Sequence, residues 1–202
     1  MIPVNREELS VLVVGLGNRE ITPDALGPRV ADNMMITRHV IREFGKYALG
    51  AEHSNLISSI VPGVMAQTGM ESLEIIRGVI RETEPDCIVA VDALEARSVK
   101  RLNRTIQITN TGINPGSGVG NHRHGLNRES VGIPVIAIGV PTVVDAATIV
   151  NDAISGYYEE VDCTLNSFFV TPKDIDESIK RLSFTISEGL NLAFEKTACT
   201  NS

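Results

Sequence analysis

Continuous apolar runs alternate along this chain with segments of helical periodicity. The apolar runs cover residues 10–16, 56–61, 87–91 and 134–139, and a shorter alternating run covers 105–108. Runs of this length without a polar face are typical of strands that are buried between two layers of helices. Strands and helices in alternation form a parallel or mixed sheet. The pattern therefore predicts an α/β fold with helices on both faces of the sheet.

Three longer segments show the apolar spacing of amphipathic helices. The first has Thr22 as its N-cap and Pro23 at its first helical position, and it ends near Gly45. The second lies within residues 69–83, and the last starts with a similar Thr-Pro pair in 171–174 and continues almost to the end of the chain. The inward side of the first helix is expected to consist of Val30, Met34, Ile41 and Phe44.

The length and composition indicate a single domain and argue against binding to nucleic acids or to membrane surfaces. A chain of 202 residues is long enough for a substantial core, and no repeat or linker divides it, so residues 1–202 are predicted to form a single domain. The formal net charge of −7 argues against non-specific nucleic-acid binding and against attraction to an anionic membrane surface. Trp is absent and aromatic residues make up 4% of the chain, so stacking platforms for single-stranded nucleic acid are not expected.

The cysteines and the apolar runs indicate a cellular compartment. Cys87, Cys163 and Cys199 are scattered and have neither zinc-ligand nor disulfide-framework spacing, which fits a reducing environment. No uninterrupted apolar run approaches the ~18 residues that a membrane span needs, and residues 1–9 lack the apolar core of a signal peptide. The protein is therefore expected to be cytoplasmic and to have no membrane partner.

Two carboxylates follow the first and third apolar runs. Asp24 comes shortly after the run 10–16, and Asp92 comes directly after the run 87–91. In an open parallel sheet, the carboxyl ends of neighbouring strands form the crevice where ligands bind. Asp24 and Asp92 are therefore expected to face one crevice, where two carboxylates can divide the roles of general acid and general base.

Each carboxylate also has a purely structural interpretation. Asp24 would be the second residue of a helix, near the positive end of its dipole, and Asp92 could cap the turn after its strand. As a pair they could act as a base and an acid. The dipole favours the ionised form of Asp24, while burial and the neighbouring charge favour the protonated form of Asp92. A pair that shares one proton can activate water and protonate a leaving amine.

A nucleotide site is the first alternative at this crevice. Gly15 and Gly17 begin the pattern of a dinucleotide-binding turn, but the position of its third glycine is occupied by Glu20. A glutamate there cannot pack closely against a strand and would repel a pyrophosphate. The two glycines are better explained by a tight turn that leads the chain into the crevice.

A metal site is the second alternative. Residues 112–128 form a long glycine-rich connection, which is expected to be functional or mobile. It lacks the Gly-Lys-Ser or Gly-Lys-Thr of a phosphate-binding loop, and its Ser117 lacks the setting of a nucleophilic serine. His122 and His124 alternate in this connection and are weak candidates for metal ligands beside the carboxylates, although solvated histidines are the simpler interpretation.

Other polar groups are candidates for positioning a substrate. The turn into the second helix, residues 63–71, could hold a substrate backbone or simply cap its own helix. The candidates for substrate positioning are Asn18, Gln67, Thr68, Gly116 and Gly118. Asp145 follows the run 134–139 and is interpreted mainly as the N-terminal residue of a helix.

Several ordered motifs together resemble one known family. They are VVGLGN at 13–18, TPDALGP at 22–28, QTGME at 67–71, DAL at 92–94, GSGVGN at 116–121, the run 132–145 and FVTPK at 169–173. Over roughly residues 11–195 the chain resembles a germination protease, the spore endopeptidase of spore-forming Firmicutes. Its motifs TPDALGP and DAL carry the family's two catalytic aspartates, which correspond to Asp24 and Asp92 here.

The resemblance implies an endopeptidase that degrades small acid-soluble DNA-protecting proteins when a spore germinates. It implies an aspartic-type peptidase that needs no cofactor and has the fold of the hydrogenase maturation peptidases, a phosphorylase/hydrolase-like fold unrelated to pepsin. It also implies a zymogen, a homotetramer and a location in the spore core. The expected protein partners are therefore the small acid-soluble spore proteins and further copies of this chain.

Two further alternatives remain open. Hydrogenase maturation peptidases bind nickel through the corresponding acids, so Asp24 and Asp92 could hold a metal with His122 or His124 as a third ligand. Family members usually carry a propeptide and a further section ahead of the first strand, which starts near residue 11 here. A shortened, non-catalytic homologue that binds protein partners is therefore the other alternative.

Overall fold

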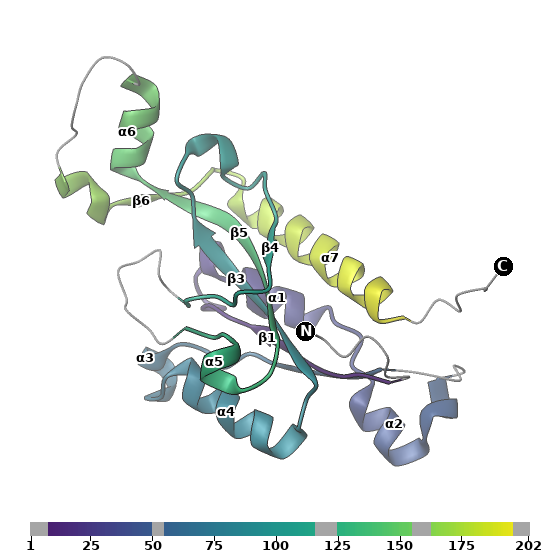
Figure 1. Ribbon diagram of the computed structural model, residues 1–202. Helices are drawn as coiled ribbons and strands as arrows, with labels where there is room; N and C mark the ends of the chain where they lie inside the picture. Colours follow the sequence, from purple (N-terminus) through teal and green to yellow (C-terminus); the bar gives the residue numbers. More distant parts are fainter. Residues whose placement is uncertain (1–7, 50–54, 116–124, 155–162, 196–202) are drawn as a thin grey trace.

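The computed structural model describes residues 8–49, 55–115, 125–154 and 163–195 (Figure 1). Its strands are β1 (Ser10–Gly15), β2 (Leu56–Ile60), β3 (Cys87–Glu95), β4 (Gln107–Thr109), β5 (Val135–Asp145) and β6 (Phe169–Val170). The described strands form one six-stranded sheet in the order β2-β1-β3-β5-β4, with β6 paired to β5. The first four strands in this order are parallel, whereas β4 and β6 are antiparallel to β5. The prediction of a parallel or mixed sheet is confirmed, and the sheet is mixed.

Helices cover both faces of the sheet, as predicted. They are α1 (Leu26–Asp32), α2 (Arg38–Phe44), α3 (Met65–Thr68), α4 (Ser72–Thr83), α5 (Arg128–Val131), α6 (Ala146–Ile154) and α7 (Ile175–Phe194). Short 3-10 turns occur at η1 (Thr22–Asp24), η2 (Lys46–Leu49), η3 (Val99–Arg101) and η5 (Cys163–Ser167). Figure 1 shows α7 along one side of the sheet and α4 with α5 along the other. No helix in the described part of the chain is long and apolar enough to cross a bilayer.

The core consists of two apolar layers, one on each face of the sheet. Because side chains alternate along a strand, β1 and β3 supply both layers from successive residues. On one face the strands pack with helix residues that include Leu26, Val30, Ile179 and Ile186. On the other face they pack with Leu73 and Ile76 of α4. Burial on both faces explains why β1 and β3 read as continuous apolar runs.

The predicted first helix is two helices with different environments. The helix is interrupted between α1 and α2. In the connection between them, the backbone N–H of Thr37 donates to the carbonyl of Ile57 on β2. Val30 and Met34 are buried as expected, but Phe44 is 69% exposed. The predicted inward stripe is therefore wrong at Phe44, because the chain forms two helices instead of one continuous helix.

Both Thr-Pro pairs were expected to start helices, and both expectations are wrong. Thr22 starts a 3-10 turn and α1 begins only at Leu26, so Asp24 is not the second residue of an α-helix. Thr171 does not cap α7, whose N-cap is Asp174, because the Thr171 hydroxyl donates to the carbonyl of Thr142 on β5. In each case the threonine and proline lead the chain toward the carboxyl ends of the strands.

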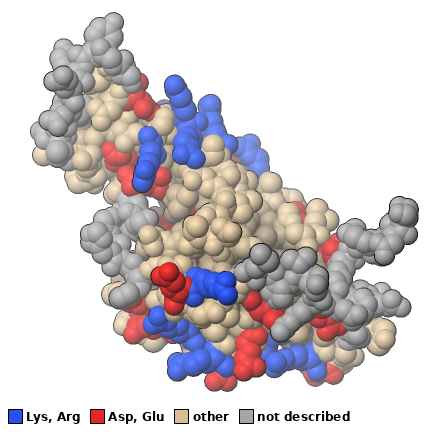
Figure 2. Space-filling view, in the orientation of Figure 1, with Lys and Arg blue, Asp and Glu red and all other residues tan. Residues whose placement is uncertain are grey.

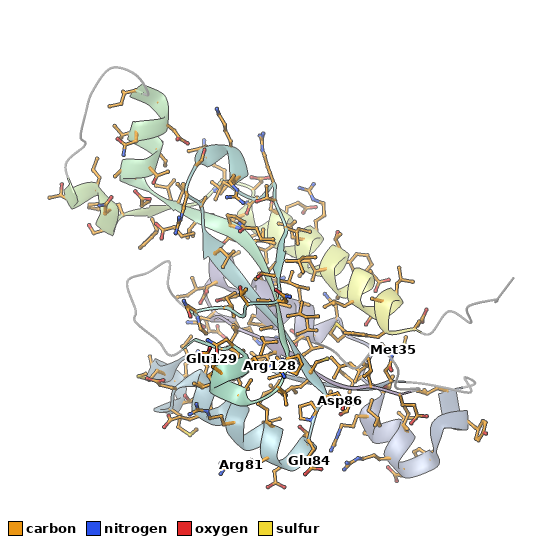
Figure 3. All side chains as sticks on the ribbon, in the orientation of Figure 1. Met35, Arg81, Glu84, Asp86, Arg128 and Glu129 are labelled. Atoms are coloured by element: carbon orange, nitrogen blue, oxygen red, sulfur yellow. The ribbon has the colours of Figure 1, made fainter. Side chains whose placement is uncertain are left out.

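Strands β3 and β5 extend past the predicted runs to Glu95 and Asp145, so Asp92 lies within β3 rather than beyond it. They continue because they pair with each other over this length, and Figure 1 shows α6 projecting beyond the far end of β5. At the opposite end of the strands, where β1 and β3 begin, the Asp86 carboxylate accepts a hydrogen bond from the backbone N–H of Ser10, at 2.9 Å. Asp86 is labelled there in Figure 3, near Arg81 and Glu84 at the end of α4.

Charged side chains of both signs lie on the helices of the α4 layer. Figure 2 shows Lys and Arg intermixed with Asp and Glu over the part of the surface where α4 and α5 lie. Among them, the Arg77 guanidinium donates to the carbonyl of Ser130 and so ties α4 to α5. This mixture is typical of the solvated face of an amphipathic helix.

Candidate active site

A cavity of about 370 Å³ lies at the carboxyl ends of β1, β3 and β5. Both Asp24 and Asp92 line it. The remaining wall is mostly apolar, with Ile21, Leu94 and Phe169 among its residues. A concave, mostly apolar site with a few polar groups at the carboxyl edge of a parallel sheet is the usual arrangement of a ligand site in this fold class.

Close backbone packing brings the Asp24 turn to the ends of the strands. A Cβ atom on Gly27 would lie 2.3 Å from the carbonyl oxygen of Leu16 and 2.4 Å from that of Val91. Only a glycine therefore permits this approach of α1 to β1 and β3. Gly17 has a φ of +111°, and a Cβ there would lie 2.1 Å from the carbonyl oxygen of Asp24. The predicted tight turn after β1 is confirmed, and it serves the approach of Asp24.

The Asp24 carboxylate is held by the turn that precedes it. Its Oδ2 accepts a hydrogen bond of 2.7 Å from the backbone N–H of Asn18. This short bond to a backbone donor favours the ionised form of the carboxylate. The expected position in the first turn of a helix is wrong, because Asp24 lies in η1 rather than in α1, and the N–H of Asn18 contacts its carboxylate there.

Asp92 lies in the middle of the sheet and is 3% exposed. Strand β3 has parallel neighbours on both sides, with Asp92 opposite Gly139 on β5. Its Oδ1 accepts a hydrogen bond of 2.9 Å from the backbone N–H of Ala93. Burial at such a position penalises the charged form of a carboxyl group. The two carboxyl groups of the cavity therefore have unlike surroundings, and their catalytic roles remain predictions.

A third carboxyl group, Glu95, lines the cavity three residues after Asp92. Burial raises the pKa of Glu95, and the charge of Asp145 and a hydrogen bond between the two side chains raise it further. The pKa of Asp145 is lowered, since hydrogen bonds from Thr148 outweigh its partial burial. Asp145 also accepts the backbone N–H of Thr148 at 2.7 Å, as a residue at the start of α6 does. Its predicted role at a helix N-terminus is confirmed.

The raised pKa of Glu95 predicts a loss of stability as the pH rises. A group that binds its proton more tightly in the folded state stabilises the fold below its unfolded pKa of about 4.3, and this contribution is lost as the pH rises through the folded value. In the Glu95→Gln variant the side chain is neutral at every pH, and its amide N–H can still donate a hydrogen bond to Asp145. We expect it to melt higher than the parent protein by roughly 2 °C at about pH 7, a small shift because Glu95 is only half-buried.

Thermal melts between about pH 4 and about pH 7 check this expectation. The difference between the two proteins should shrink toward the acid end, where Glu95 is mostly protonated in both states. Glu82→Gln, an exposed glutamate on α4, is the control for losing one charge. A melting difference that stays constant with pH would show that Glu95 acts through packing instead.

Three hydroxyl groups lie among the described residues of the cavity wall. The Ser72 hydroxyl donates to the carbonyl of Gly63 at 3.3 Å, and the Thr171 hydroxyl donates to the carbonyl of Thr142 at 2.9 Å. The Thr142 side chain is 1% exposed, and its Oγ1 has no partner in the described part of the protein. Sequence reasoning missed Glu95, Thr142 and Thr171, because it treated the residues after each apolar run as turns and helix starts.

Two predicted positioning residues meet beside the Asp24 turn. The Gln67 side-chain amide donates to Oδ1 of Asn18 at 3.3 Å, and the same oxygen accepts the backbone N–H of Glu20 at 3.0 Å. Neither side chain is part of the described cavity wall, which contains the adjacent Gly17. Thr68 is exposed, and its hydroxyl donates to the carbonyl of Met70 at the turn into α4. Thr68 thus has the capping environment that was its alternative interpretation.

The remaining candidates lie outside the described residues. They are Gly116, Gly118, His122 and His124. Within the described ranges, no group of three or more His, Cys, Asp or Glu side chains is arranged to hold a metal ion. The two described carboxylates of the predicted metal set, Asp24 and Asp92, both line the cavity.

Comparison with solved structures returns proteins of low sequence identity. A [NiFe] hydrogenase maturation protease, HycI from Thermococcus kodakarensis, is 21% identical, and the match covers 89% of this chain and 91% of that one with a TM-score of 0.42. The hydrogenase maturating endopeptidase HybD from E. coli is 11% identical, with a TM-score of 0.40 over 92% of this chain and 94% of that one.

Comparison with protein families and curated relatives gives a closer relationship. The profile of the family described as germination protease matches residues 3–161. The germination protease of Caldanaerobacter subterraneus subsp. tengcongensis is 44% identical over 220 residues, which cover 94% of this chain and 67% of that protein. The germination protease of Bacillus velezensis is 55% identical over 148 residues, which cover 73% of this chain and 40% of that protein. The chain thus spans about two thirds or less of these relatives, and it belongs to the germination protease family.

Proposed function

We propose that the cavity at the carboxyl ends of β1, β3 and β5 is the active site of an endopeptidase. The observation that carries the proposal is the presence of Asp24 and Asp92, from two different segments, in the wall of one cavity of about 370 Å³. Membership of a peptidase family supplies the reaction class, hydrolysis of a peptide bond. Two carboxyl groups in unlike surroundings are what this reaction needs, because it requires both a base and an acid.

In the proposed mechanism Asp24 is the general base. The N–H of Asn18 stabilises its carboxylate, so Asp24 is ionised and can accept a proton from water. The oxygen of that water attacks the carbonyl carbon of the peptide bond, and the electron pair of the C=O bond moves to the oxygen. A tetrahedral intermediate with a negatively charged oxygen results.

Asp92 is the general acid. Its burial favours the neutral form, which carries the proton that the leaving nitrogen needs when the C–N bond breaks. The electron pair of that bond stays with the nitrogen, and the proton from Asp92 converts it into an amine. Asp24 holds the proton taken from water until Asp92 has given up its own, and transfer of that proton from Asp24 to Asp92 then restores the starting state, in which the pair shares one proton.

The substrate that we propose is a small acid-soluble spore protein, and the proposed assembly is a homo-oligomer, a tetramer in particular. Both follow from the family alone. An open cavity lined mainly by apolar side chains fits an extended polypeptide better than a small polar metabolite. The spore core as the place of action, activation from a zymogen and an aspartic-type mechanism belong to the same proposal.

Incubation of the purified protein with a small acid-soluble spore protein at near-neutral pH tests the proposal. Intact mass spectrometry should detect discrete fragments from the parent protein and none from Asp92→Asn. Fragments from both would point to a contaminating protease or to a different site. A stable complex without fragments would favour the non-catalytic, partner-binding alternative.

A further inference from the structure

The Thr142 hydroxyl has surroundings that the packing of the fold does not explain. Its side chain is 1% exposed, and its oxygen has no hydrogen-bond partner among the described residues. Buried hydroxyl groups nearly always have a partner, since losing the bonds to water without replacement destabilises the fold. An orphan hydroxyl in a cavity wall is therefore a candidate for a hydrogen bond to a ligand.

A local irregularity of the sheet puts Thr142 in this position. Leu94 on β3 is opposite Pro141 on β5, but the next residue, Glu95, is opposite Val143. Thr142 is the extra residue on β5 and has no opposite residue on β3. Bulges of this kind change the direction of a side chain and are frequent beside active sites.

The backbone around Thr142 is fixed by three hydrogen bonds from outside β5. The carbonyl of Pro141 accepts the N–H of Asn103 at 2.7 Å, and that of Val143 accepts the N–H of Ala96 at 2.7 Å. The carbonyl of Thr142 itself accepts the hydroxyl of Thr171 at 2.9 Å. Because a β-branched side chain is also stiff at χ1, the hydroxyl is held in a defined direction before any ligand binds.

The composition of the cavity wall indicates what the hydroxyl would bind. The ionised carboxylate of Asp24 can only accept hydrogen bonds, and the proton of neutral Asp92 is the one that the proposed mechanism gives to the leaving nitrogen. The hydroxyl protons of Ser72 and Thr171 are donated to backbone carbonyls. Of the three hydroxyl groups in the described cavity wall, that of Thr142 is therefore the one whose proton is not donated to a group of the protein.

We propose that the Thr142 hydroxyl donates a hydrogen bond to the carbonyl oxygen of the peptide bond that is cleaved. The proposal rests on the proposed function of the cavity and adds a residue that acts on the substrate itself. Negative charge develops on this oxygen when water attacks, in a site whose acidic wall would otherwise repel that charge. A neutral donor held by the fold stabilises the charge without reorganisation during the reaction.

The test compares Thr142→Val with Thr142→Ser in the cleavage of a small acid-soluble spore protein. Valine keeps the branched shape and removes the hydroxyl, so kcat should fall by about 10- to 100-fold while KM changes less. Serine keeps the hydroxyl, so it should restore most of kcat. Thr83→Val is the matched control, because the Thr83 hydroxyl donates to the carbonyl of Val79 within α4, outside the described cavity wall, and its loss should leave kcat unchanged.

The outcomes separate this proposal from the proposed function. If the parent protein cleaves and Asp92→Asn does not, while Thr142→Val keeps the parental kcat, the cavity is the active site and the assignment of Thr142 is wrong. Equal losses in the valine and serine variants would also reject it, since shape rather than the hydroxyl would then matter. If the parent protein produces no fragments, both proposals fail.

Discussion

Asp92→Asn and Asp24→Asn are each expected to lower kcat/KM for peptide cleavage by about 10²–10⁴-fold. Asparagine has nearly the shape of aspartate but cannot donate a carboxylic proton or accept one from water. The fold should persist, because an amide oxygen can still accept the N–H of Ala93 at position 92 or that of Asn18 at position 24. Steady-state rates together with melting temperatures measure the two effects separately.

The double variant gives the sharper test of a pair. Residues that act as one unit show strongly non-additive losses, so Asp24→Asn combined with Asp92→Asn should be little slower than the slower single variant. Losses that multiply would instead show two independent contributions. Asp32→Asn is the matched control, because Asp32 pairs with Arg19 on the surface and lies outside the described cavity wall. Parental activity in either single variant would reject the proposed division of roles.

The fold could be predicted from the sequence where burial alone determines the pattern. Strands β1 and β3 are buried on both faces, so their apolar runs stand out without an alignment. A parallel or mixed sheet was also predicted, since strands alternate with helices. Local propensity was less reliable, because Thr22 starts only a 3-10 turn, and the Thr171 hydroxyl donates to Thr142 instead of capping a helix.

The carboxylates of the site could be predicted, whereas the rest of its wall could not. Asp24 and Asp92 follow two apolar runs, and the rule for the carboxyl ends of parallel strands places both at one crevice. Glu95 and Thr142 lie in the cavity because β3 and β5 continue past the apolar runs and lose register by one residue. A register shift depends on pairing between distant segments, so no local pattern near Thr142 indicates it.

Gly27→Ala is the second substitution from which we expect a large effect. The added methyl group would lie 2.3 Å and 2.6 Å from backbone atoms of Leu16 and 2.4 Å from the carbonyl oxygen of Val91. The backbone of β3 and of the residue after β1 cannot yield as a flexible side chain can, so α1 must move away from the sheet. Overpacking of this kind destabilises a protein by about 1–3 kcal/mol, and we expect the melting temperature to fall by roughly 5 °C.

The same movement should impair cleavage beyond the loss of folded protein. Asp24 lies two residues before α1 and is carried by the turn that this glycine allows to approach β1 and β3. A displacement of about 1 Å at a catalytic group can lower a rate by about 10²-fold, so we expect a loss of that order at temperatures where Gly27→Ala is fully folded by circular dichroism.

Gly78→Ala is the matched control, because it makes the same chemical change inside a helix. No heavy atom lies within 4 Å of a Cβ placed on Gly78 in the middle of α4. Alanine is the better helix former there by about 0.5–1 kcal/mol, so this variant should melt slightly higher and cleave at the parental rate. If Gly27→Ala behaved like Gly78→Ala in both measurements, the close approach of α1 would not be what places Asp24. A variant at position 27 that is destabilised but cleaves normally when folded would separate the packing role of this glycine from the geometry of the site.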